Sequence, residues 1–203
     1  MNLVDCIAEY NNILSDEMCD VMIDWFNANT ELQDDGAIGT IDGEGVVNNT
    51  IKKARQSYPS PDDPISDLMT EIFKKTYREY KKDHFAPEDS SMVALRDYSI
   101  RVYDKNDGHF LRHMDQAGVA SRLFAIIMYL NTVDQGGETE FPDHNVKVKP
   151  EKGKVLIFPC NFMFYHQGNT PISGDKWIAT AFINLIIPKA TNNPKREPVK
   201  ISY

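Results

Sequence analysis

The sequence has little cysteine, no excess of positive charge and no long hydrophobic run. Its cysteines, Cys6, Cys19 and Cys160, are odd in number and far apart, so they predict neither a disulfide framework nor a CxxC metal site. Lys and Arg number 22 against 30 Asp and Glu, and the resulting net charge of -8 opposes binding to a phosphate backbone. We therefore expect a reducing compartment and no nucleic-acid partner.

The longest apolar run, residues 123–130, is too short to cross a bilayer and indicates a buried strand instead. Asp5 and Glu9 interrupt the start of the chain, where a signal peptide would need an apolar segment. These features predict a cytoplasmic protein without a membrane partner. A length of 203 residues is enough for one domain with its own core.

Two helices are predicted in the first part of the chain. One starts at a candidate N-cap, Ser15, followed by Asp16 and Glu17 in the first turn. The other runs from Pro64 to Lys82 and carries an apolar stripe made by Ile65, Leu68, Met69, Ile72, Phe73, Thr76, Tyr77 and Tyr80. Between them we expect a loop or hairpin in the glycine-rich segment 34–49 and a strand near residues 53–57.

The second half of the chain consists of short β-rich runs separated by Gly, Pro, Asn and Asp. We predict eight strands, at residues 92–103, 109–115, 122–131, 138–141, 145–150, 153–159, 161–167 and 176–187. Strands of this length and spacing are typical of a sandwich, a jelly roll or a small barrel. The predicted fold class is therefore α+β, mainly β, followed by an extended polar arm at residues 188–203.

Histidine and aspartate lie two positions apart at His113 and Asp115. On a strand they would share one face and point into a barrel, while Met114 would point away. A metal needs a third protein ligand, for which both His109 and His166 are candidates. Two histidines and one carboxylate form the facial triad of non-haem Fe(II) oxygenases, which leaves positions for a cosubstrate and O2.

Lys176 begins an otherwise apolar strand, ten residues after His166. A cation that points into a barrel needs an anion to offset its desolvation, and a dicarboxylate cosubstrate would supply one. The hydroxyl groups of Tyr103, Tyr129 and Thr139 are further candidates to line the same pocket.

Four segments together resemble the catalytic domain of prolyl 4-hydroxylases, which are Fe(II)- and 2-oxoglutarate-dependent dioxygenases. They are "RVYDKNDGHFLRHMD", "MYLNTVDQGGETEFP", "KPEKGKVLIFP" and "HQGNTPISGDKWIATAF". The resemblance implies a single catalytic domain, 1–203, with a double-stranded β-helix (jelly-roll or cupin-like) core at 89–187. Residues 1–88 would be a helical support with a substrate-side strand and loop at about 34–60, and 188–203 a C-terminal arm.

The same resemblance assigns roles to individual residues. The metal ligands and catalytic residues would be His113, Asp115 and His166, and 2-oxoglutarate would be bound by Lys176, Tyr103, Thr139 and Tyr129. Substrate contacts would come from Arg122, Arg55 and Ser57. The implied cofactors are Fe2+, 2-oxoglutarate and O2, with ascorbate as an accessory, and the implied partner is a proline-containing peptide or protein bound by a monomer or homodimer.

Two features depart from the family pattern. Phe110 stands three residues before the first ligand, where the family usually has tyrosine, and the acidic loop 34–49 has no counterpart. Two alternatives therefore stay open: the same oxygenase chemistry on a free amino acid or small metabolite, and a non-catalytic jelly-roll module that binds metal or ligand.

Overall fold

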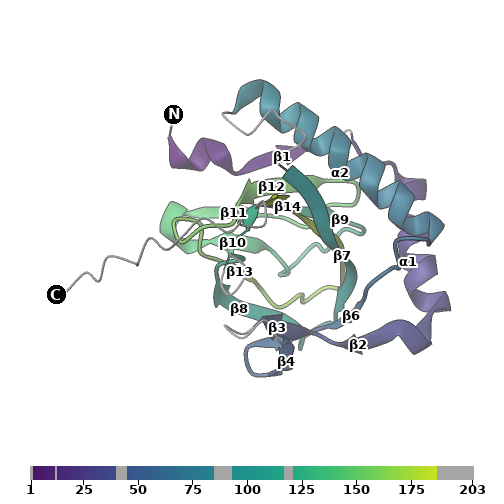
Figure 1. Cartoon of the computed structure of the whole chain (residues 1–203). Helices are drawn as coiled ribbons and strands as arrows, with labels where there is room; N and C mark the ends of the chain where they lie inside the picture. The colour runs from purple at the N-terminus through teal and green to yellow at the C-terminus, as the bar shows by residue number, and fades with distance from the viewer. Residues whose placement is uncertain (1, 12, 40–44, 85–92, 117–120, 187–203) are drawn as a thin grey trace, which may run out of the picture.

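The structure is a computed structural model that describes residues 2–11, 13–39, 45–84, 93–116 and 121–186. Two antiparallel sheets pack face to face, and two helices lie outside the larger one (Figure 1). The larger sheet has the order β1 (Ala8–Tyr10), β12 (Val155–Pro159), β9 (Arg122–Tyr129), β14 (Lys176–Leu185), β7 (Val93–Tyr103), β6 (Arg55–Ser57) and β2 (Gln33–Asp35). The smaller sheet has the order β11 (Val146–Val148), β10 (Thr139–Phe141), β13 (His166–Gly168), β8 (His109–His113) and β5 (Lys52–Lys53). The two-stranded hairpin pairs β3 (Ala37–Gly39) with β4 (Gly45–Val47).

This arrangement confirms the predicted fold class, a mainly β double-stranded β-helix supported by helices. Strand β9, in the interior of the larger sheet, is buried on both faces. Phe124, Ile126 and Met128 pack in the core that contains the helices, and Ala125, Ile127 and Tyr129 pack in the core between the sheets. Alternate residues of a strand point to opposite faces, so burial of both faces explains the continuous apolar run.

Both predicted helix starts are confirmed. α1 (Asp16–Ala28) begins after Ser15, whose hydroxyl accepts a hydrogen bond from the Met18 amide at 3.4 Å. α2 (Pro64–Asp83) begins after Asp63, which accepts one from the Ile65 amide at 3.0 Å and another from the Trp25 indole at 2.8 Å. The Asp63 carboxylate therefore caps α2 and also ties it to α1.

The predicted apolar stripe of α2 packs against the outer face of the larger sheet, and all of it except Leu68 is buried. Phe73 stacks on Tyr98 of β7 with 5.7 Å between ring centroids. From α1, Phe26 meets the Trp177 ring edge to face at 5.3 Å. The helices thus cover one side of the sheet and leave its other side for the site.

The part before residue 85 is less helical than predicted. Besides the 3-10 turns η1 (Leu3–Cys6) and η2 (Thr30–Leu32), it supplies β1, β2 and β6 to the larger sheet and β5 to the smaller one. Strands of two or three residues are too short to show an alternation of apolar and polar residues in the sequence. Their formation depends on pairing with distant segments of the chain. The segment 34–49 forms the hairpin β3–β4 in its described residues.

Two strand predictions were too long. The strand expected at 109–115 ends at His113, and the one expected at 161–167 begins only at His166. β8 and β13 pair antiparallel, and their pairing stops at His113 opposite His166, so the chain beyond both residues leaves the sheet. A 3-10 turn, η3 (Pro142–His144), follows β10. The predicted arm 188–203 lies outside the described residues, among which no helix is both long and apolar enough to span a membrane.

Candidate active site

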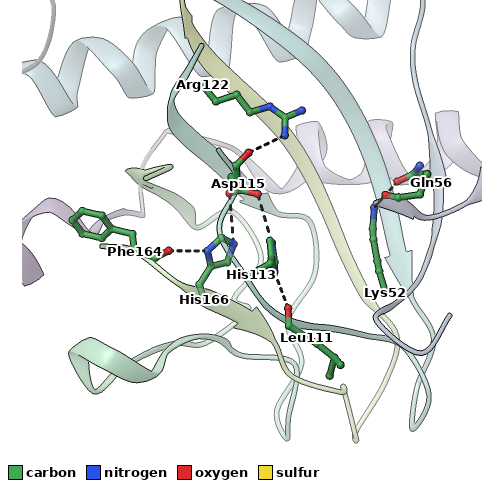
Figure 2. A network of polar contacts seen from close by, with 9 residues as sticks. Lys52, Gln56, Leu111, His113, Asp115, Arg122, Phe164 and His166 are labelled. Atoms are coloured by element: carbon green, nitrogen blue, oxygen red, sulfur yellow. Dashed lines mark hydrogen bonds and ion pairs between the residues drawn. The ribbon is translucent and has the colours of Figure 1, made fainter. Parts of the chain in front are cut away.

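Three metal-ligand side chains gather at one end of the space between the sheets (Figure 2). His113 Nε2 lies 3.6 Å from one carboxylate oxygen of Asp115, and His166 Nε2 lies 3.5 Å from the other. One potential ligand atom from each residue falls within 4.8 Å of the others. Asp115 reaches this cluster from the turn after β8, where the Gln116 amide donates to the Cys160 carbonyl at 3.0 Å, and not from the strand face that the sequence suggested.

The backbone orients both imidazole rings. His113 Nδ1 is 2.8 Å from the Leu111 carbonyl oxygen, and His166 Nδ1 is 3.2 Å from the Phe164 carbonyl oxygen (Figure 2). A carbonyl only accepts hydrogen bonds, so each Nδ1 carries the proton and each Nε2 presents its lone pair to the cluster. Such outer contacts are those that hold histidine ligands at a metal.

The charge states also suit a divalent metal. Burial raises the pKa of the Asp115 carboxyl, but its electrostatic interactions with His166, His113 and Arg122 outweigh burial and hold the pKa well below the usual range. Burial, with the charge of His113 next in size, lowers the pKa of His166 to about 4. At neutral pH the cluster therefore offers a carboxylate and a neutral imidazole, the forms that ligate Fe2+.

A cavity beside the triad contains the predicted cosubstrate residues Tyr103, Thr139 and Lys176 in its wall. Lys176 is the first residue of β14, directly opposite Tyr103 on β7, and its side chain is only 3% exposed. Burial lowers its pKa to about 7, although the charge of Glu138 opposes this shift. Among the described residues no carboxylate forms an ion pair with Lys176, so this ammonium fits an anionic ligand.

Tyr129 plays an indirect part. Its hydroxyl donates a hydrogen bond to Thr139 Oγ1 at 2.7 Å, and it stands behind Thr139 rather than in the cavity wall. Gly136 lies just before Thr139 with φ of 72°, and a Cβ there would stand 2.3 Å from the Thr170 carbonyl oxygen. The GG dipeptide therefore makes the tight turn that delivers Thr139 to the cavity.

A second, open cleft of about 510 Å³ lies on the other side of the triad, with hairpin β3–β4 in its wall. Arg122, a predicted substrate residue, lines this cleft: its guanidinium donates to the Asp97 carboxylate at 2.9 Å and to the Asp115 backbone oxygen at 3.2 Å. The same group lies 3.7 Å from the centre of the Phe182 ring. His113 and Asp115 line both the cavity and the cleft, so a metal would lie between them.

The structure does not bring Arg55 or Ser57 into this cleft. Arg55 is exposed and pairs with Asp104 at 3.3 Å, and Ser57 is fully buried in β6. Gln56, between them, faces inward instead and accepts a hydrogen bond from Lys52 at 2.8 Å, as alternation along a strand requires (Figure 2).

His109 also stays outside the metal cluster. It is the first residue of β8, and its Nδ1 is hydrogen-bonded to the Asp107 carbonyl oxygen at 2.9 Å. Phe110, the departure from the family pattern, stacks on the His113 ring with 3.5 Å between centroids. Sequence reasoning missed Arg101, which lines both cavities. Arg101 lies two residues before Tyr103, so the two side chains share one face of the strand, and this spacing could have indicated that Arg101 belongs to the site.

Comparisons with known proteins agree with this geometry. Residues 98–184 match the 2OG-Fe(II) oxygenase superfamily. Prolyl 4-hydroxylase 2 of Arabidopsis thaliana is 26% identical over 87% of this chain and 66% of its own length, so the chain spans about two thirds of that relative.

Two solved structures share the fold. The viral collagen prolyl hydroxylase of Paramecium Bursaria Chlorella virus-1, in its 2OG complex, superposes with a TM-score of 0.64 at 21% identity, over 89% of this chain and 97% of its own. A Trichoplax adhaerens prolyl hydroxylase, in complex with a hypoxia inducible factor peptide fragment, superposes with a TM-score of 0.69 at 16% identity. The match covers 88% of this chain and 83% of that protein's chain. Residues 98–184 therefore form a 2OG-Fe(II) oxygenase domain, and most of the chain is similar in sequence to prolyl 4-hydroxylases.

Proposed function

We propose that the chain hydroxylates a proline residue in a peptide or protein and couples this to decarboxylation of 2-oxoglutarate to succinate and CO2. One observation carries the proposal: His113 and Asp115 form a common wall between a cavity that ends at a buried cation and an open cleft. A cosubstrate and a macromolecular substrate can thus reach the same metal from different sides. The names of the relatives support proline as the target.

The residues divide the work as follows. Fe2+ held by His113, Asp115 and His166 would supply the O2 activation that a C–H hydroxylation needs, and three protein ligands leave open coordination positions. Lys176 would pair with the far carboxylate of 2-oxoglutarate, and the nearby hydroxyl of Thr139 would donate a hydrogen bond to it.

Aromatic rings pack around the two histidine ligands. Phe141 and Phe158 flank the His166 ring at 5.4 and 4.7 Å, and Phe110 covers His113. No side chain would have to act as a strong base, because bound Fe2+ would supply the chemistry for C–H cleavage.

The test is succinate formation by the purified chain with Fe2+, 2-oxoglutarate and a panel of proline peptides, with mass spectrometry of the peptide. We expect peptide-dependent succinate and the gain of one oxygen atom on proline. Peptides with alanine in place of proline serve as the control. Succinate that depends on a free amino acid or metabolite but on no peptide would contradict the proposal and support a small-molecule oxygenase.

We further infer a cytoplasmic enzyme that acts as a monomer or homodimer, takes no nucleic-acid substrate and uses ascorbate as an accessory. The supports are the net charge of -8 and the absence of a disulfide among Cys6, Cys19 and Cys160, all of which are described. Cell fractionation, light scattering and turnover with and without ascorbate test these points separately.

A further inference from the structure

Arg101 lies where the cosubstrate cavity and the open cleft meet. It belongs to β7, opposite Ile178 of β14 on one side and Gln56 of β6 on the other. Its side chain lines both spaces, as do His113 and Asp115. A group on the substrate that approached the metal through the cleft would therefore pass the Arg101 guanidinium.

The other two basic side chains of the cleft already have partners. Arg122 pairs with Asp97 at 2.9 Å. Lys52 donates hydrogen bonds to the Ala37 carbonyl at 3.0 Å and to Gln56 Oε1 at 2.8 Å, which fixes the base of hairpin β3–β4. Figure 2 shows Arg122 on the Asp115 backbone oxygen and Lys52 on Gln56. Their hydrogen bonds fix the walls of the cleft.

The Arg101 Nε, like that of Arg122, is shielded from solvent and has no hydrogen-bond partner. Unlike Arg122, Arg101 forms no ion pair with a carboxylate in the part of the chain that the structure describes. The Arg101 side chain contacts the Tyr103 hydroxyl, which is neutral. Because guanidinium stays protonated, a half-buried one that lacks a counter-ion gains strongly from a carboxylate ligand with matching geometry.

The cosubstrate does not supply this carboxylate in our assignment, because its far carboxylate pairs with Lys176 and its other end binds the metal. We propose that Arg101 binds an acidic side chain of the peptide substrate close to the target proline. This inference rests on the proposed function and adds a substrate class to it. The net charge of -8 disfavours acidic peptides at long range, so a preference for them would have to arise from a local cation.

The experiment compares kcat/KM for matched proline peptides in which Asp and Asn, or Glu and Gln, alternate at each position near the proline, at constant ionic strength. For the wild type we expect the best acidic peptide to exceed its amide counterpart by about tenfold, as for one charge-assisted contact. Arg101→Gln should bring this ratio to about one. Arg101→Lys should keep the preference for the acidic peptide, which separates an effect of the positive charge from an effect on folding. The exposed Arg78→Gln on α2 is the matched control and should keep the wild-type ratio.

A wild-type ratio near one, or an unchanged ratio in Arg101→Gln, would overturn the inference. So would an Arg101→Gln variant that keeps the ratio and binds 2-oxoglutarate at least about tenfold more weakly, since Arg101 would then serve the cosubstrate. These results are distinct from failure of the proposed function, in which neither acidic nor amide proline peptides would stimulate succinate formation.

Discussion

His113 and His166 lie directly opposite each other in the antiparallel pairing of β8 with β13, with 4.3 Å between their ring centroids. This pair is the last one of the ladder, so the chain is free to turn immediately after His113 and to bring Asp115 back between the rings. The end of a strand pair thus creates a three-ligand site from two segments that are remote in sequence.

Replacement of any triad residue by alanine should abolish turnover. Loss of a ligand weakens metal binding at least as much as loss of a residue that orients a ligand. We therefore expect the Fe2+ affinity and the rate of succinate formation to fall by about 100-fold or more. Metal titration monitored by calorimetry checks this, with His109→Ala as the matched control because His109 lies outside the cluster. Full activity in Asp115→Ala would contradict the assignment.

Lys176→Met should raise the KM for 2-oxoglutarate by about 100-fold, because a buried carboxylate would lose its counter-ion at a cost of about 3 kcal/mol. Lys152→Met, which removes a partly exposed lysine paired with Asp20, should leave the KM unchanged. Steady-state succinate assays at varied 2-oxoglutarate measure both. An equal KM in wild type and Lys176→Met would exclude Lys176 from the cosubstrate site.

The affinity for 2-oxoglutarate should fall as the pH rises above about 7. Burial lowers the pKa of Lys176 to about 7, and a bound carboxylate raises it again. Below pH 7 the ammonium is already present and the affinity is constant. Above pH 7 binding must also take up a proton, so the affinity drops by up to about tenfold per pH unit. Anaerobic titrations with Mn2+ in place of Fe2+ between pH 6 and about 9 measure the slope, and Lys176→Arg, which stays protonated, should flatten it.

Tyr129→Phe should destabilise the protein by about 1 kcal/mol, because it leaves the buried Thr139 hydroxyl without its donor. Thr139 also loses its fixed rotamer, so the KM for 2-oxoglutarate should rise severalfold. Urea unfolding and succinate assays measure the two effects. Tyr165→Phe, at a half-buried tyrosine next to Arg112, is the control that should change neither.

Phe73→Ala should lower the free energy of unfolding by about 3–5 kcal/mol. Phe73 is fully buried between α2 and the larger sheet, so its removal leaves a cavity in the core that holds the helix in place. Denaturant unfolding of Phe73→Ala and of the neighbouring exposed Lys74→Ala gives the comparison, and Lys74→Ala should stay within about 0.5 kcal/mol of wild type. Similar midpoints for the two variants would show that α2 adds little to stability.

The features that could be predicted depend on near neighbours in the chain. Ser15 and Pro64 indicate where the helices begin, because each residue type is favoured at the start of a helix. The apolar stripe from Ile65 to Tyr80 follows the 3.6-residue period of a helix. The apolar run of β9 is long enough to indicate a strand buried on both faces. The order of HxD, GGETxFP and His-x9-Lys carried the family resemblance, which placed His166 and Lys176 with the HxD pair before any geometry was known.

The tertiary structure decided what depends on distant neighbours. Asp115 enters the site from a turn because the β8–β13 ladder stops at His113. Gln56, rather than Arg55 or Ser57, reaches Lys52 beside the cleft because of the β6–β7 register. Arg101 belongs to the site for the same kind of reason. The alternation along β7 shows which face it shares with Tyr103, but only the packing of the two sheets shows that this face meets the candidate metal site, and that no carboxylate among the described residues forms an ion pair with Arg101 there.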